Sequence, residues 1–184
     1  VETAPAIRQQ NLRNYLACYE SPPPLFLLAE APGPWGCRFS GVPITSEAQL
    51  ASEDFPIDGE RTSRDVDLHS EYSASIFWRV LQPYFPQFFV WNSVPLHPHD
   101  PGDPLTIRTP RRSEVRAWQD LLTQLLDTLV PERILAVGRK AERALNEAGA
   151  APTYIRHPSQ GGATKFEAGV RDVLADLGLQ KVHP

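Results

Sequence analysis

Apolar residues recur along the chain in two patterns, and together these predict a chain in which helices and strands alternate. Short apolar runs are typical of strands buried in a sheet, and they cover residues 25–29, 87–91, 134–137 and the more exposed 153–156. Apolar residues three and four apart, with Pro or Gly near the ends, are typical of helices. The predicted helices cover residues 5–19, 46–51, 70–84, 113–129, 139–147 and 164–177.

This alternation predicts the fold class. Strands that alternate with helices form a parallel sheet whose two faces are both covered by helices. The chain has 184 residues, which fits one domain with a sizeable core. We therefore expect a single α/β domain over residues 1–184, with a three-layer α/β/α architecture and a central four-stranded parallel sheet. The polar segment 55–67 is predicted to be a mobile loop.

Composition narrows the class of protein further. The two cysteines, Cys18 and Cys37, are too few for a disulfide framework or a four-cysteine metal or iron–sulfur site. They favour a reducing, cytoplasmic setting. No apolar run approaches about 18 residues, so we expect no membrane span. Nothing in the composition indicates a cofactor or an obligate protein partner, and we expect a monomer.

An unusual loop follows each predicted strand. The first strand leads into Glu30-Ala31-Pro32-Gly33 and the second into Asn92. Gly138-Arg139-Lys140 follows the third, and His157-Pro158-Ser159-Gln160-Gly161-Gly162 follows the fourth. Loops at the carboxyl ends of parallel strands share one edge of the sheet, where α/β folds bind ligands. A Glu, an Asn and a His are therefore predicted to converge there.

The net charge is −4, yet positive side chains gather in or beside these loops. They are Arg38, Arg108, Arg111, Arg112, Arg139, Lys140, Arg156 and Lys165. An acidic chain with a local basic face is suited to binding phosphates at that face alone. The alternative is that these charges are scattered and solvated.

The same loops resemble motifs of the uracil-DNA glycosylase superfamily. Residues 29–33, Ala-Glu-Ala-Pro-Gly, are similar to the Gly-Glu-Ala-Pro-Gly turn of its iron–sulfur branch, often called family 4. Asn92 resembles the uracil-reading Asn that closes the second strand, and residues 157–159 resemble the His-Pro-Ser motif. Residues 108–110, Arg-Thr-Pro, look like a further segment of that branch. Residues 36–47, 92–110 and 157–166 also resemble a bacterial subgroup without the cluster.

The resemblance implies a DNA repair enzyme that flips uracil out of DNA and hydrolyses its N-glycosidic bond, with other deaminated bases as further candidates. It implies catalytic roles for Glu30 and His157, and base reading by Asn92. Backbone close to the base would come from Ala31, Pro32 and Gly33. Contacts to DNA are expected from Ser159, Gln160, Gly161, Gly162, Arg108, Arg139 and Lys140.

Several positions depart from the superfamily pattern. Ile44 stands where relatives stack an aromatic ring on uracil, so Phe39 or Trp35 is the candidate ring from a shifted position. Residues 160–162, Gln-Gly-Gly, replace the Leu that wedges into duplex DNA. The iron–sulfur cysteines are missing, so the expected enzyme has neither a cofactor nor a metal.

Two other functions remain open from the residues. The departures at Ile44 and at residues 160–162 favour a DNA-binding member of the fold with weak or lost catalysis. His97, His99 and Asp100 would suit a metal-dependent hydrolase, although the sequence assures no third metal ligand. The preference for single- or double-stranded DNA is also open.

Overall fold

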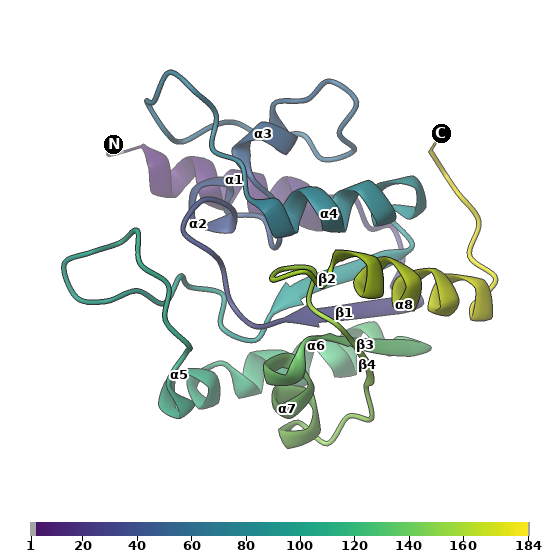
Figure 1. Cartoon of the computed structure of the whole chain (residues 1–184). Helices are drawn as coiled ribbons and strands as arrows, with labels where there is room; N and C mark the ends of the chain where they lie inside the picture. Colours follow the sequence, from purple (N-terminus) through teal and green to yellow (C-terminus); the bar gives the residue numbers. More distant parts are fainter. Residues whose placement is uncertain (1–2, 184) are drawn as a thin grey trace.

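Four parallel strands form the central sheet of the computed structural model, which describes residues 3–183 (Figure 1). The strands are β1 (Leu25–Ala29), β2 (Phe88–Asn92), β3 (Arg133–Val137) and β4 (Thr153–Ile155). Their order across the sheet is β2-β1-β3-β4. Strand β1 is central and buried along its whole length, with Leu25 paired to Phe88 on one side and to Arg133 on the other. This placement explains its continuous apolar sequence.

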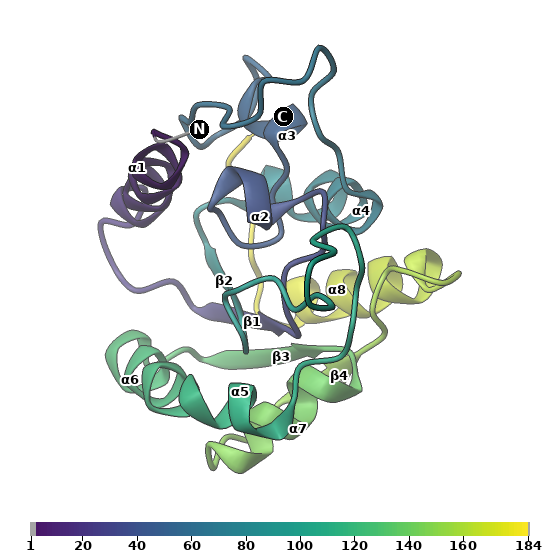
Figure 2. The same cartoon turned by 90° about the vertical axis from the view of Figure 1, so that its left-hand side faces the viewer.

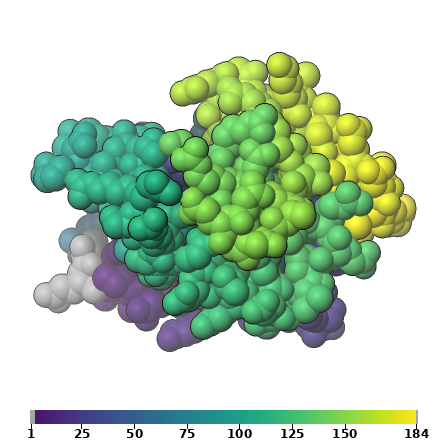
Figure 3. Space-filling model, turned by 90° about the horizontal axis from the view of Figure 1, so that it is seen from below, coloured from purple at the N-terminus to yellow at the C-terminus, as the bar shows by residue number. Residues whose placement is uncertain are grey.

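Helices cover both faces of the sheet, so the predicted three-layer α/β/α class is confirmed. One layer holds α1 (Ala4–Ala17), α4 (Tyr72–Leu81) and α8 (Ala163–Asp176), with the short α2 (Cys37–Ser40) and α3 (Glu47–Leu50). The other layer holds α5 (Arg112–Ala117), α6 (Gln119–Leu129) and α7 (Arg139–Glu147). Seen from below, α7 lies at the centre of this second layer, with the loop 93–111 to one side (Figure 3).

Aromatic side chains fill the space between the first helical layer and the sheet. Phe77 of α4 contacts Phe88 and Phe166, with ring centroids 5.9 and 6.0 Å apart. Tyr15 of α1 is fully buried, and its hydroxyl donates to Val90 O at 3.0 Å and accepts from Val90 N at 2.9 Å. Strand β2 is at the edge of the sheet, so Tyr15 satisfies backbone groups that would otherwise be free to pair with another strand.

Two helical segments differ from the sequence prediction. The helix expected over residues 113–129 is divided at Trp118, whose backbone leaves the helical region at φ −108° and ψ 3°. Helix α2, which the sequence did not predict, ends at Gly41 in the left-handed region at φ +77°. A glycine there terminates a helix without steric strain.

The segment 55–67 is anchored, although its polar composition predicts a mobile loop. Phe55 and Ile57 are buried in the core. The side chain of Asn11, itself buried, donates to Glu60 O and accepts from Glu60 N, both at 2.8 Å. Glu47 is fully buried and accepts hydrogen bonds from the backbone and hydroxyl of Ser63. The polar composition of this segment therefore satisfies buried partners instead of keeping the segment in solvent.

Candidate active site

The four strands end at one edge of the sheet (Figure 2). A cavity lies at this edge. Its lining comes from the turn after β1, the ends of β2 and β3, the loop after β4 and the start of α4. The lining residues are Ala29, Ala31, Pro32, Gly33, Cys37, Ile44, Glu71, Ser73, Phe77, Asn92, Val137, His157 and Pro158. We call this space the central cavity. The topology thus brings together loops that are up to about 130 residues apart in the chain (His157 against Ala29).

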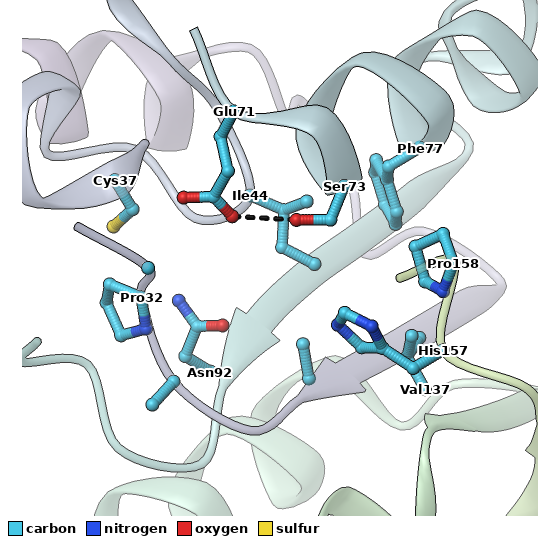
Figure 4. Close-up of a pocket in the computed structure, with 13 residues that line it drawn as sticks. Pro32, Cys37, Ile44, Glu71, Ser73, Phe77, Asn92, Val137, His157 and Pro158 are labelled. Atoms are coloured by element: carbon cyan, nitrogen blue, oxygen red, sulfur yellow. Dashed lines mark hydrogen bonds between the residues drawn. The ribbon is translucent and has the colours of Figure 1, made fainter. Parts of the chain in front are cut away.

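His157 enters the central cavity from the loop after β4 (Figure 4). The backbone N–H of Ser159 donates to His157 Nδ1 at 3.2 Å, and Ser159 Oγ lies 2.8 Å from the same nitrogen. Since Nδ1 accepts a hydrogen bond, these contacts assign the proton of the neutral ring to Nε2. Burial lowers the pKa of His157 below its ordinary value, and the charge of Arg156 lowers this pKa further. The site therefore favours a neutral imidazole with one free donor.

Asn92 is the last residue of β2, and its side chain points into the central cavity. Only 3% of the residue is exposed. Its backbone pairs in register with Ala29 of β1, which holds the side chain beside the turn after β1. The amide offers both a donor and an acceptor to a bound molecule.

The turn after β1 supplies the wall next to Asn92. Ala31, Pro32 and Gly33 all line the central cavity. His97 Nδ1 lies 2.8 Å from Pro32 O, and His97 Nε2 lies 3.2 Å from Pro104 O. His97 therefore connects the cavity wall to the loop after β2.

Apolar side chains form the remaining walls of the central cavity. The aromatic ring among them is not one of the predicted residues. Ile44 lines the central cavity with its backbone at φ +48°, which is unusual for a β-branched residue. Phe39 does not line it; its ring packs on His69, with centroids 4.1 Å apart. Phe77 of α4 supplies an aromatic ring instead. The predicted helix over 70–84 contained Phe77, but no motif distinguished it from an ordinary core residue.

Glu30 faces away from the central cavity and lines a neighbouring one. This second cavity also contains Ser93, Thr109 and Lys140. Burial raises the pKa of the Glu30 carboxyl, while the charge of Lys140 lowers it in part. Its Oε1 is buried and has no hydrogen-bond partner within residues 3–183. Because side chains alternate along the turn, Ala29 and Ala31 face one cavity and Glu30 the other.

Glu71 and Ser73 are polar residues of the central cavity that the sequence did not single out. Ser73 Oγ donates to Glu71 Oε1 at 2.7 Å, as drawn in Figure 4. Burial raises the pKa of the Glu71 carboxyl, and the hydrogen bond from Ser73 lowers it only in part. Both residues come from the start of α4, for which the apolar pattern predicts only a helix.

The predicted DNA-contacting residues fall into two groups. Ser159, Gln160, Gly161 and Gly162 form the turn that leads from Pro158, which lines the central cavity, into α8. Arg108 instead forms two hydrogen bonds with Glu114, at 2.6 and 2.8 Å, and Arg139 pairs with Glu142 at 2.8 Å. Lys140 lies beside Glu30 in the second cavity.

His97, His99 and Asp100 do not form a metal site in this structure. Both nitrogens of His97 are engaged by carbonyl oxygens, and His99 Nδ1 lies 2.9 Å from Asp100 O. Across residues 3–183, no three His, Cys, Asp or Glu side chains are grouped so that they can hold a metal ion. The same part of the chain contains no helix long and apolar enough to cross a membrane.

The fold places the chain among α/β proteins with a parallel sheet, in which ligands bind at the carboxyl ends of the strands. The sequence profile of the Uracil DNA glycosylase superfamily matches residues 19–178. The chain therefore belongs to the uracil-DNA glycosylase superfamily. The crystal structure of wild-type Pedobacter heparinus SMUG2 is similar, with a TM-score of 0.66, 13% identity, and coverage of 92% of this chain and 84% of that one. Among curated proteins, no sequence match is found.

Proposed function

We propose that the protein is a monofunctional DNA glycosylase that hydrolyses the N-glycosidic bond of uracil in DNA and leaves an abasic site. The observation that carries this proposal is the convergence of Asn92 and His157 on one cavity. The two residues lie at opposite edges of the sheet, on β2 and after β4. An enzyme that excises a base needs a pocket for the extruded nucleotide and a group that stabilises the leaving base.

The central cavity supports recognition of a flat, polar-edged base. Phe77 and Ile44 provide apolar surface, and the Asn92 amide provides a donor and an acceptor. Strand pairing with Ala29 fixes the backbone position of Asn92, so its side chain starts from a fixed point on the cavity wall. A base with adjacent N–H and carbonyl groups, such as uracil, complements this amide.

His157 supports stabilisation of the leaving base. Cleavage of the glycosidic bond leaves negative charge on the uracil ring, and a donor aimed at a carbonyl oxygen stabilises it. With Nδ1 engaged by Ser159, the free donor of a neutral His157 is Nε2–H. The lowered pKa keeps the ring neutral near pH 7, so the donor is a neutral imidazole.

Glu30 is the residue proposed to activate the attacking water, as the resemblance implies. Its carboxyl lines the second cavity, across the turn from Asn92 and His157, and its buried Oε1 has no hydrogen-bond partner within residues 3–183. This role therefore requires the turn or the Glu30 side chain to move when DNA binds. A raised pKa makes this carboxylate a better proton acceptor than an ordinary glutamate. We also propose that the protein releases other deaminated bases. We further propose that it belongs to the cluster-free, family 4-like subgroup.

Base release tests the proposal directly. Oligonucleotides carrying one uracil, hypoxanthine or xanthine would be presented single-stranded and opposite each base, with a chelator present. We expect wild-type release of uracil, a loss of about 10²- to 10³-fold in His157→Ala, and a loss of about tenfold or more in Asn92→Ala. His99→Ala and Asn146→Ala are matched controls outside the central cavity and should keep the wild-type rate.

Two outcomes would contradict the proposal. Wild-type protein that binds DNA but releases no base would favour a DNA-binding member of the fold without catalysis. The placement of Glu30 outside the central cavity is the observation that favours this second candidate. Loss of release on adding the chelator would indicate metal-dependent chemistry instead.

A further inference from the structure

The carboxyl of Glu71 is an unexplained polar group inside the central cavity. It enters from the start of α4, and only its Oε1 has a partner, the hydroxyl of Ser73. Its Oε2 is buried against the backbone of Gly33 and Gly36. The Gly36 N–H lies close enough to lower the pKa of the carboxyl, but no hydrogen bond of normal geometry reaches Oε2 within residues 3–183. Buried polar atoms in folded proteins nearly always have a partner, so an exception in a ligand cavity indicates that a ligand supplies one.

The surrounding backbone leaves room for this carboxyl. A Cβ added to Gly33 would lie 2.5 Å from Glu71 Oε2, and one added to Gly36 would lie 2.4 Å from it. Any other residue at either position would displace the carboxyl. Both glycines belong to the segment after β1, so the Pro32 side of the cavity is shaped around Glu71.

Glu71 and Asn92 approach the same space from opposite sides (Figure 4). Glu71 belongs to the helical layer above the sheet, whereas Asn92 ends a strand of the sheet itself. A base that fills the central cavity would lie between the two side chains, with His157 on a third side. The Asn92 amide can fill only one of the two lone pairs on a carbonyl oxygen of such a base, so that oxygen can accept a second hydrogen bond.

We propose that Glu71 is a second base-reading group, whose neutral carboxyl donates a hydrogen bond to the carbonyl oxygen on the edge of the base that Asn92 also reads. This inference rests on the proposed glycosylase function and extends it. The donor selects bases with a carbonyl at that position, such as uracil and hypoxanthine. It disfavours cytosine, which places an amino group there. The buried position of Glu71 favours the neutral form that such donation needs.

The experiment compares Glu71→Gln and Glu71→Ala with wild type. Gln keeps a donor of similar size, whereas Ala removes it. Single-turnover release is measured on single-stranded oligonucleotides with one uracil, hypoxanthine or cytosine, and the thermal unfolding midpoint reports folding. Tyr72→Ala is the matched control, since Tyr72 is the exposed neighbour and does not line the central cavity.

We expect Glu71→Gln to stay within about threefold of wild type on uracil. Glu71→Ala should fall about tenfold or more, the loss of one hydrogen bond, with a smaller preference for uracil over cytosine. The unfolding midpoint should not fall in Glu71→Gln, because Gln keeps the size of the side chain and the oxygen that accepts from Ser73.

Two results would overturn the inference while leaving the glycosylase proposal intact. One is wild-type uracil release and selectivity in Glu71→Ala. The other is an equal loss in both variants accompanied by a lower unfolding midpoint, which would indicate a structural role at the start of α4. Wild-type protein that releases no base from any oligonucleotide would overturn both proposals.

Discussion

Replacement of Gly162 by Ala tests whether the position of His157 controls base release. Gly162 precedes α8 with φ −84° and ψ −5°, a conformation that alanine adopts without strain. An added Cβ would lie 2.0 Å from His157 O, whereas ordinary contact begins at 3.4 Å. The shortfall is 3.4 − 2.0, or about 1.4 Å, and a second contact with Ser159 O at 3.0 Å blocks one way of relieving it. The loop that carries His157 must therefore move.

The size of this movement sets the expected effect on rate. Misplacement of a catalytic group by about 1 Å lowers a rate by about 10²-fold. We therefore expect Gly162→Ala to lower single-turnover uracil release by about 10²-fold. The free energy of unfolding should fall by about 1–2 kcal/mol, because the clash lies in a surface turn. The unfolding midpoint should therefore fall by only a few degrees.

The neighbouring glycine provides the control. Gly161 has φ +72°, and nothing lies within 4 Å of a Cβ built on it. Gly161→Ala should therefore lose about 1–2 kcal/mol of stability from the left-handed backbone while leaving His157 in place. Its release rate should stay within about threefold of wild type. Release at the wild-type rate in Gly162→Ala would show that the position of His157 does not control base release. An equal loss of rate in both variants would show the same.

Three further predictions concern charge. Glu47→Gln should lower the free energy of unfolding in urea by about 2–4 kcal/mol, because the buried carboxylate accepts bonds from Ser63 N and Oγ at 2.8 and 2.7 Å. Burial raises the pKa of Glu47, but the hydrogen bonds it accepts hold it below the ordinary value. This stabilisation is present above the unfolded pKa and disappears as pH falls through the folded one, so the wild-type advantage over Glu47→Gln should shrink below about pH 4. Uracil release should fall as pH drops through the lowered pKa of His157. A second ring proton, on Nδ1, would face the Ser159 N–H and break the hydrogen bond between them. A release rate that is unchanged from about pH 8 to pH 5 would contradict this prediction. Lys140→Gln should weaken DNA binding and reduce the salt slope of log K by about 1; an unchanged slope in titrations at several salt concentrations would place Lys140 away from phosphates.

The position of Glu30 illustrates why motif order does not give geometry. The sequence places Glu30 in the turn after β1, and the resemblance implies catalysis by it. The structure places its carboxyl in a cavity beside Lys140, across the turn from Asn92 and His157. Sequence adjacency alone cannot decide which side of a turn a side chain faces, because that depends on the backbone angles of the turn.

The layered α/β architecture, and the edge at which all four strands end, could be predicted from the sequence alone. Strand burial and helix periodicity are local signals, and parallel strands place their carboxyl ends at one edge without further information. The predicted positions of Asn92, His157 and the Ala31–Gly33 turn around one cavity followed from that topology.

Which side chains share the cavity depends on packing between elements that are far apart in the chain. Phe77 and Glu71 enter it from a helix, where their spacing is indistinguishable from that of core or capping residues. Phe39 leaves it because its ring packs on His69, some 30 residues further along the chain. The polar segment 55–67 is anchored through Asn11 and Glu47, which lie 49 and 16 residues from their partners Glu60 and Ser63. Such contacts join residues whose separation no local pattern records, so packing alone fixes them.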